Sequence, residues 1–498
     1  MQAVLESIRS GYTLMYIVTW EEDRVERALN SIAQNMFAHR DCTVWTAADG
    51  LKAEGVDAAA TRDPCRALEQ VMNLDQKGFY IFKDIADHFD RNPALVRRLR
   101  DAYYALKDKD KYIIILSPRF SVPEILKREI YLMEFDLPDE EEIYEHIKPA
   151  MSRLMPDRTI SDDTLKELSL ALKGFTLSEV SHSLNKIFAP ETVMDEAMER
   201  IFREKEQIVR KEGVLEFVPP RFHIAEIGGL DVLKEWLIKR EQLFTAKARE
   251  YDVPLPRGIL LMGVSGCGKS LAVKAISSLW KLPLFRLDMN LVFSGAVDSP
   301  ESLFHKALKQ MEAMAPAVLW IDEIEMGVAG YREGESISSA HIFAHFLTWM
   351  QEKNANVFVA ATANRIHLLP AEIIRKGRFD QIFFIDLPND EERKQIFAIH
   401  LKKNGVDPAL FDMVLLSVAT KGWNGSEIEQ AVAAARVDAF YQNRHMSAGD
   451  ITRNISKIVP LSKTMEAQIK QIKGWAFDRA LPASSKSTKL TVKPDSGS

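Results

Sequence analysis

The feature that most constrains this chain is a glycine-rich segment near its middle. Residues 263–270 read Gly-Val-Ser-Gly-Cys-Gly-Lys-Ser and fit the pattern G-x-x-x-x-G-K-[ST], the P-loop, whose backbone N–H groups enclose phosphates. The apolar run 258–262 predicts a buried strand before it, and residues 271–279 predict a helix after it. We expect Lys269 to reach the β- and γ-phosphates and the Ser270 hydroxyl to ligate Mg²⁺. A glycine-rich turn without a ligand is the alternative, and matching segments downstream argue against it.

Two later segments supply the expected acidic and polar groups. Residues 317–323 form an apolar run that ends in Asp322 and Glu323. About 50 residues after a P-loop, this pattern indicates that Asp322 holds Mg²⁺ directly or through water and that Glu323 polarises the attacking water. A second apolar run ends at Asn364, which we expect to orient the water or sense the γ-phosphate. A simple turn asparagine is the alternative reading of Asn364.

Two arginines, Arg375 and Arg378, follow this polar group. Their spacing of three residues predicts that they share one helical face. Surface salt bridges are the commoner fate of such arginines. The combination with the P-loop favours arginines that enter the nucleotide site of a neighbouring copy and stabilise transferring charge, an effect of roughly 10³–10⁵ in rate.

Length and composition bound the class of protein. A chain of 498 residues exceeds a single core, so roughly two to four domains are expected. The net charge of −6 provides no overall basic surface, which makes nucleic acid an unlikely partner. No apolar run approaches the roughly 20 residues of a membrane span, so we expect no membrane insertion. The three cysteines lack metal-ligand spacing, and Cys267 is expected to be a packed bystander. A cytoplasmic location, or the stroma of an algal plastid, is the expectation.

The region from about residue 225 to 458 resembles an ATPase module of the AAA clade within the AAA+ superfamily. The matching segments are Ile227-Gly228-Gly229, the P-loop, Asp322-Glu323, Ala361-Thr-Ala-Asn364, Arg375-x-x-Gly-Arg-Phe-Asp380 and Lys421-Gly-Trp-Asn-Gly-Ser-Glu427. More narrowly, Trp320-Ile-Asp-Glu-Ile324, Phe346-Leu-Thr-Trp349, Leu368-Leu-Pro370 and Arg375-Lys-Gly-Arg-Phe-Asp380 resemble the AAA family encoded in algal plastids and cyanobacteria and found in other bacteria.

This resemblance implies an α/β P-loop fold, in which helices flank a parallel sheet and a C-terminal helical lid follows. It also implies a homo-oligomeric ring, commonly a hexamer, with ATP and Mg²⁺ at the subunit interfaces. Ile227 and Gly228 would lie near the adenine, and Gly425 would flank the nucleotide. The residues expected to bind the nucleotide are Ile227, Gly228, Gly263, Val264, Ser265, Gly266, Cys267, Gly268, Lys269, Ser270, Leu271 and Gly425.

The N-terminal half echoes the second half at a nearly constant offset. Leu14-Met15 corresponds to Leu261-Met262, and Gly174-Phe175 corresponds to Gly422-Trp423. The expected strands at 14–19, 78–82 and 112–116 alternate with helices, which favours a mostly parallel sheet. We therefore predict a degenerate, AAA-like α/β domain, although apolar strands also recur by chance.

This first copy has lost the residues that the chemistry needs. Residues 17–23 stand at the P-loop position and include three carboxylates that would repel a triphosphate. Lys83 stands where the second copy has Asp322, and Pro118 stands where it has Asn364. We predict that this half binds no ATP and serves packing, oligomer support or partner recognition.

The expected domains are 1–215 for the degenerate half, 216–389 for the nucleotide-binding domain, 390–460 for the lid, and 461–498 for an extension with a disordered tail. Residues 192–212 are expected to form a charged, solvated helix, and 216–221 a linker. His341 and His345 have metal-ligand spacing, but their apolar neighbours favour packing histidines.

The stretch 293–301 has Ala296 and Asp298 where many AAA rings have an aromatic residue and a glycine in a pore loop. This departure argues against threading of polypeptides. A second pore-facing loop is expected at 327–338.

Taken together, the sequence predicts Mg²⁺-dependent ATP hydrolysis by an oligomeric ring, coupled to remodelling of an unidentified protein or complex. One alternative is a nucleotide-dependent binding scaffold with little turnover. A nucleic-acid motor or loader is a weaker alternative, because neither a helix-turn-helix nor an RNA-binding pattern is evident.

Overall fold

The computed structural model describes residues 2–37, 40–156, 158, 160–189, 193–219, 222–244, 253–293, 299–327, 337–353, 355–375 and 377–485. Contacts divide the chain into two units. The first comprises residues 1–150 and 175–184, and the second comprises residues 151–174 and 185–498.

The first unit is built on a six-stranded sheet in the order β3-β2-β4-β5-β1-β6. All neighbouring strands are parallel except the β2–β3 pair. Its elements, two of which run past its limits, are α1 (Gln2–Arg9), β1 (Leu14–Val18), α2 (Glu22–Met36), β2 (Thr43–Thr46), β3 (Gly50–Leu51), α3 (Pro64–Asn73), β4 (Gly78–Lys83), α4 (Pro93–Leu106), β5 (Lys111–Ser117), β6 (Ile130–Glu134), α5 (Glu140–Leu154) and α7 (Leu177–Ile187).

The second unit holds a seven-stranded sheet in the order β13-β12-β8-β11-β10-β9-β7. Its elements begin with α6 (Asp162–Leu172), α8 (Met194–Glu212), β7 (Leu215–Val218), α9 (Asp231–Ile238), β8 (Gly258–Gly263), α11 (Lys269–Trp280), β9 (Leu284–Leu287), α12 (Met289–Phe293), α13 (Pro300–Ala313) and β10 (Ala317–Ile321). They continue with α15 (Ile337–Glu352), β11 (Val357–Ala363), α16 (Ala371–Ile374), β12 (Gln381–Ile385), α17 (Asp390–Lys403), α18 (Met413–Ala419), α19 (Gly425–Tyr441), α20 (Ala448–Ile455), α21 (Leu461–Thr464), α22 (Glu466–Ala476) and β13 (Leu481–Pro482).

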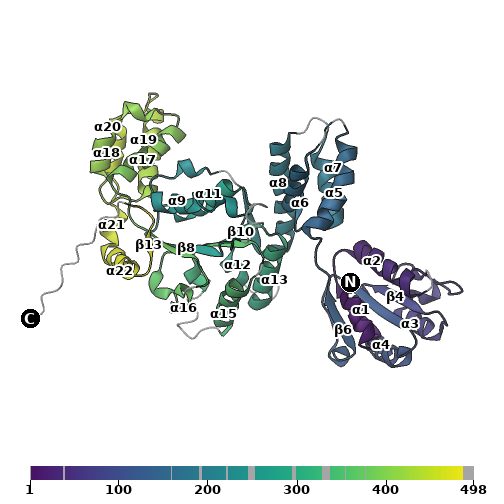
Figure 1. Cartoon of the computed structure of the whole chain (residues 1–498). Helices are drawn as coiled ribbons and strands as arrows, with labels where there is room; N and C mark the ends of the chain where they lie inside the picture. The colour runs from purple at the N-terminus through teal and green to yellow at the C-terminus, as the bar shows by residue number, and fades with distance from the viewer. Residues whose placement is uncertain are drawn as a thin grey trace, which may run out of the picture. The chain divides into compact units, whose positions relative to one another are not determined.

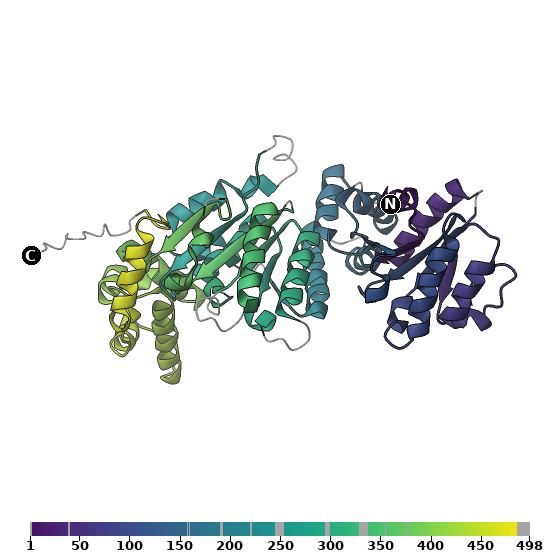
Figure 2. The same cartoon turned by 90° about the horizontal axis from the view of Figure 1, so that it is seen from below.

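Helices cover both faces of this second sheet, as both views show (Figures 1 and 2). Because side chains alternate between the faces of a strand, Ile259 and Leu261 of β8 pack with α9 and α11, whereas Leu260 and Met262 pack with α13 and α15. The central strands are apolar throughout, as expected of parallel strands buried on both faces. Helices α17–α20 form a separate helical cluster with its own core around Phe397 and Trp423. The predicted α/β fold with a helical lid is confirmed.

Each sheet contains a run of five parallel strands whose order is the same in both units. The order is β6-β1-β5-β4-β2 in the first unit and β12-β8-β11-β10-β9 in the second. The residue after β4 and the second residue after β10 are both acids in the left-handed region, Asp84 at φ 54° and Glu323 at φ 47°. Such backbone angles are uncommon for residues other than glycine. These shared features support the predicted duplication.

Two local expectations are wrong. The expected linker at 216–221 begins with β7, an edge strand that pairs antiparallel with β9 and buries Phe217. Helix α8 is not simply a solvated face, because Ala197, Ile201, Lys205 and Val209 are buried along one side of it. Their spacing of four residues makes a buried stripe that the many charges of the helix conceal.

Some sequence expectations fall wholly or partly outside the described residues. They include Thr192 of the expected charged helix, Pro220 and Arg221 of the linker, 294–298 of the first pore loop, 328–336 of the second, and 486–498 of the tail. Across the part of the chain that the structure does describe, none of the helices combines the length and the apolar character needed to cross a membrane.

Lys205 allows a test of this packing. Burial, with a smaller contribution from the charge of Lys173, lowers the pKa of Lys205 to about 7. The unfolded chain therefore binds more protons than the folded chain between about pH 7 and 10.5, and Lys205 costs stability below that window. We expect Lys205→Met to raise Tm by several degrees at pH 6 and by progressively less toward pH 10, as measured by calorimetry. An equal shift at every pH would contradict this account.

Candidate functional site

The P-loop connects β8 to α11 and depends on two glycines. Gly263 has φ 148°, and a Cβ there would lie 1.9 Å from the backbone oxygen of Ile385 on the neighbouring strand β12. Gly266 has φ 76°, and a Cβ there would lie 2.8 Å from Cγ of Asn424 in the lid. Larger residues at these positions would push the loop away from the strand and the lid, so the glycines set the path of the backbone.

Lys269 lies at the first turn of α11 and is buried. Its Nζ donates to the backbone oxygens of Gly263 at 3.0 Å and Val264 at 2.9 Å. Burial lowers the pKa of Lys269, and the negative charges of Glu325, Asp322 and Glu323 are among those that oppose this shift. An anionic phosphate placed in the loop would favour the charged ammonium in the same way.

Cys267 is partly buried and packs against the core that contains α9 and α11. Burial raises the pKa of its thiol to about 12, so the thiol stays protonated at neutral pH.

Strands β10 and β11 are hydrogen-bonded neighbours, and their carboxyl ends bring the predicted polar groups together. The Thr362 hydroxyl donates to Oδ1 of Asp322 at 2.5 Å, and its oxygen accepts from the Glu323 backbone N–H at 3.0 Å. Asn364 Nδ2 donates to Oε1 of Glu323 at 2.8 Å. Glu323 and Asn364, predicted separately as catalytic, are therefore in direct contact.

The oxygen donors at this edge suit Mg²⁺. Ser270 offers a hydroxyl at the start of α11, and Asp322 offers a carboxylate at the end of β10. Mg²⁺ prefers such hard oxygen ligands and keeps several waters. The donor chemistry of the two residues predicted as ligands thus fits the ion.

The lid contacts the P-loop directly. At the start of α19, the Ser426 N–H donates to the Gly266 oxygen at 3.1 Å, and Asn424 Nδ2 donates to the Ser265 oxygen at 3.2 Å. A Cβ added to Gly425 would lie 3.2 Å from the backbone oxygen of Gly266 and 4.0 Å from Cδ1 of Ile396.

The same isoleucine connects the predicted adenine-binding residues to this place. Cγ1 of Ile396 lies 2.6 Å from the place of a Cβ on Gly228, so only glycine fits against it without a shift. Ile227, the residue before it, is buried in the core shared with α9 and α11. Gly228, Ile396, Gly425 and the P-loop therefore lie next to one another in the fold.

Arg375 and Arg378 lie toward the amino ends of the parallel strands, because they precede β12. The P-loop lies at the carboxyl ends, because it follows β8. Asp380 and Gly258 exchange two hydrogen bonds, at 2.9 and 2.8 Å, which anchors this segment at the start of β8. Gly263 lies five residues along β8 from Gly258, which corresponds to a distance of about 17 Å.

The expectation that Arg375 and Arg378 share a helical face is wrong. Helix α16 ends at Ile374, and Arg375 has extended backbone angles. The helix stops before Gly377, whose φ of 99° is incompatible with a continuing right-handed helix. Arg378 donates to the backbone oxygen of Glu372, and Arg375 is exposed.

The equivalent place in the first unit is filled by internal ion pairs. Lys83, at the end of β4, contacts Glu22 at 3.1 Å and Glu26 at 2.9 Å, both on α2. Oε1 of Glu21 accepts from the Leu177 N–H at 2.8 Å. The helix after β1 thus carries acids where α11 carries Lys269, so the charges are reversed relative to a phosphate site.

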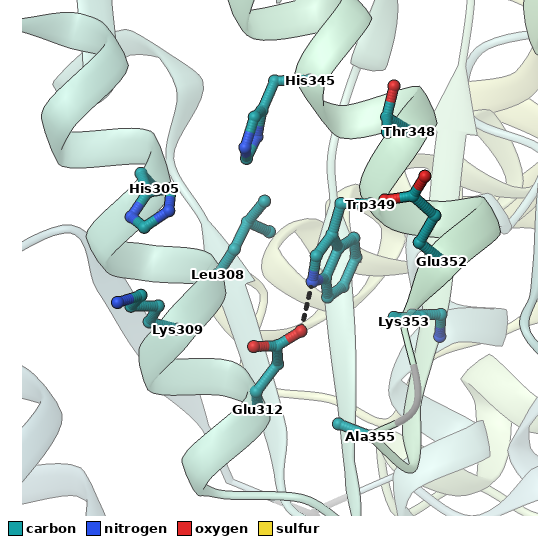
Figure 3. Close-up of a pocket in the computed structure, with 10 residues that line it drawn as sticks. All are labelled: His305, Leu308, Lys309, Glu312, His345, Thr348, Trp349, Glu352, Lys353 and Ala355. Atoms are coloured by element: carbon teal, nitrogen blue, oxygen red, sulfur yellow. Dashed lines mark hydrogen bonds between the residues drawn. The ribbon is translucent and has the colours of Figure 1, made fainter. Parts of the chain in front are cut away.

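A groove of about 460 Å³ lies between α13 and α15, away from these residues (Figure 3). Trp349 Nε1 donates to Glu312 across it at 2.7 Å. His345 faces His305 with ring centroids 5.5 Å apart, and His341 and His345 are both exposed. The expectation that these two histidines are packed is therefore wrong, because the apolar face of α15 runs through Ile342 and Phe346 instead. Among the described residues, no group of three or more His, Cys, Asp or Glu is arranged to hold a metal ion.

Comparison with known proteins places the chain. Residues 2–135 match the model of the SpoVK-like AAA ATPase N-terminal domain, residues 141–212 match the second domain of the same family, and residues 259–387 match the ATPase family associated with various cellular activities (AAA). The AAA domain-containing protein ycf46 of Pyropia yezoensis is 38% identical over 95% of this chain and 96% of its own length. The chain belongs to the AAA ATPase family of the ycf46 type. The ycf46 protein of Trieres chinensis is 36% identical over 94% of this chain and 95% of its own. A proteasome-activating nucleotidase of Sulfurisphaera tokodaii is 29% identical over 48% of this chain.

Sequence reasoning missed three residues of this ycf46-type site, Thr362, Ile396 and Glu325. Thr362 lies inside the motif Ala361-Thr-Ala-Asn364, so the motif contained a signal for it. Ile396 looks like any apolar residue of a lid helix. Glu325 lies two residues after Glu323, in a turn where an acid gave no signal of its own.

Proposed function

We propose that this chain hydrolyses ATP with Mg²⁺ in an oligomeric ring and uses the cycle to remodel a protein or complex. The observation that carries the proposal is the position of Glu323 and Asn364, which touch each other beside Asp322 at the strand ends next to the P-loop. Family membership supports the ATPase activity. The site residues, the four domain ranges and a cytoplasmic or stromal location are parts of the same proposal.

In this mechanism, Lys269 and the P-loop N–H groups hold the β- and γ-phosphates. The Glu323 carboxylate accepts a hydrogen bond from the attacking water, and Asn364 fixes the position of that carboxylate. Ser270 and Asp322 would hold Mg²⁺, which supplies charge stabilisation at the phosphates when bound. Isolation of the water and phosphates under the lid strengthens these electrostatic interactions.

A neighbouring copy would complete the site. Arg375 and Arg378 precede β12 and so lie toward the amino ends of the strands, whereas the P-loop follows the carboxyl end of β8, about 17 Å from the start of that strand. Rigid strands lie between the two edges, so the arginines have no route to their own nucleotide. In a ring, the amino ends of the strands in one chain would face the carboxyl ends of the strands in the neighbouring chain. This arrangement would place Arg375 and Arg378 at the γ-phosphate of that neighbour.

Complementation tests this arrangement. Arg378→Ala and Lys269→Ala chains should each be nearly inactive alone, whereas mixed assemblies should regain activity, because intact arginines then face intact P-loops. Co-expression with two affinity tags and tandem purification provides the mixed assemblies, and the ATPase rate per chain is measured. Mixed assemblies without recovered activity would contradict action in trans, and concentration-independent, near-zero turnover of the wild type would favour a scaffold.

A further inference from the structure

Glu325 is a buried acid beside the proposed catalytic residues that the mechanism has not yet used. It lies in the short 3-10 helix Ile324–Gly327 after β10 and is 1% exposed. A carboxylate so far from water is costly unless hydrogen bonds compensate it. Its surroundings therefore indicate what it is for.

One oxygen of this carboxylate accepts two backbone hydrogen bonds. Glu325 Oε1 accepts from the Asn364 N–H at 2.8 Å and from the Arg365 N–H at 3.0 Å. Because both N–H groups donate to the same charged oxygen, these hydrogen bonds fix the backbone conformation just after β11. Asn364 then directs its Nδ2 to Glu323 at 2.8 Å.

The remaining polar atoms here are incompletely satisfied. Glu325 Oε2 and Asn364 Oδ1 are buried, and neither has a hydrogen-bond partner among the residues that the structure describes. Unsatisfied buried acceptors are rare in native proteins and often mark functional places. A polar arrangement retained at such a cost suits a role in the site better than a role in stability.

The inactive first unit serves as an internal comparison. Asp84 there has the backbone conformation of Glu323, so Ala86 stands at the position of Glu325. Pro118, which has no N–H, stands at the position of Asn364. Both partners are thus absent from the copy that has lost Asp322 and Lys269.

We propose that Glu325 is a positioning residue, which holds the backbone at Asn364 and Arg365 so that the Asn364 amide fixes the Glu323 carboxylate. This inference rests on the proposed ATPase function. Glu325 acts through the backbone hydrogen bonds that it accepts at Asn364 and Arg365. Its charge matters because a neutral amide accepts the two N–H bonds more weakly.

The test compares Glu325→Gln with the wild-type chain in steady-state ATPase assays. We expect kcat to fall roughly 10- to 100-fold, as small misplacements of catalytic groups do. The dissociation constant for N-methylanthraniloyl-ADP should stay within about twofold to threefold of the wild-type value. Each chain should still bind one equivalent of the nucleotide. Glu325→Asp should restore part of kcat, and it serves also if Glu325→Gln folds poorly. Glu312→Gln, which alters a carboxylate in the groove between α13 and α15, is the matched control and should retain kcat.

A double-mutant cycle identifies the route of the effect. Because Glu325 acts through Asn364, Glu325→Gln should cost little further activity in the Asn364→Ala background. Additive losses, an unchanged kcat in Glu325→Gln, or a fall in bound equivalents that matches the fall in kcat would each overturn the inference. Absence of turnover in the wild-type chain would instead overturn the proposed function.

Discussion

Lys269→Ala should abolish measurable nucleotide binding by the whole chain. Lys269 is buried in the P-loop, and removing one partner of a buried, hydrogen-bonded charge pair commonly costs 2–5 kcal/mol or more. We therefore expect the dissociation constant for ATP to rise roughly 100-fold or more. Titration of the full chain with N-methylanthraniloyl-ATP measures both affinity and stoichiometry.

The stoichiometry also tests the first unit. The wild-type chain should bind one equivalent of nucleotide, and the Lys269→Ala chain should bind none, because in the first unit Lys83 stands at the position of Asp322 and is already paired with Glu22 and Glu26. Lys281→Ala, which changes an exposed lysine just after the same helix, provides a control that should bind normally. One equivalent remaining in Lys269→Ala would show that the first unit retains a nucleotide site.

Glu323→Gln should keep nucleotide binding and block turnover. The substitution preserves the size of the side chain and its contact with Asn364, but it removes the negative charge that polarises water. Loss of such a group commonly lowers rates by 10²–10⁴-fold. Phosphate release under saturating ATP, compared with the affinity for N-methylanthraniloyl-ATP, separates the two effects. A normal rate in the purified variant would refute the role given to Glu323.

The same variant provides a route to the partner. A chain that binds ATP without hydrolysing it should hold its assembly and its substrate longer than the wild type does. Affinity purification of Glu323→Gln in ATP, with Lys269→Ala as the matched control, therefore separates nucleotide-dependent partners from background. Partners that bind both variants equally would contradict coupling between ATP and substrate.

Most secondary structure could be predicted from the sequence. Helix Glu22–Met36 and the buried strands around the P-loop follow from periodicity and from the punctuating glycines. The errors occurred where a local pattern was ambiguous. The prolines of segment 216–221 suggested a linker. Leu215–Val218 is instead a strand, because it pairs with β9 at the end of the sheet.

The sequence by itself predicted the phosphate-binding chemistry of the P-loop, because that chemistry uses backbone groups and neighbours within eight residues of chain. It also indicated Asp322, Glu323 and Asn364, each at the end of an apolar run. Only the tertiary structure decided that Asn364 contacts Glu323, that Glu325 holds the backbone of Asn364, and that Arg378 lies at the opposite edge of the sheet. Those relations depend on the order and register of strands distant in the chain, which strand pairing and burial set and no local pattern encodes.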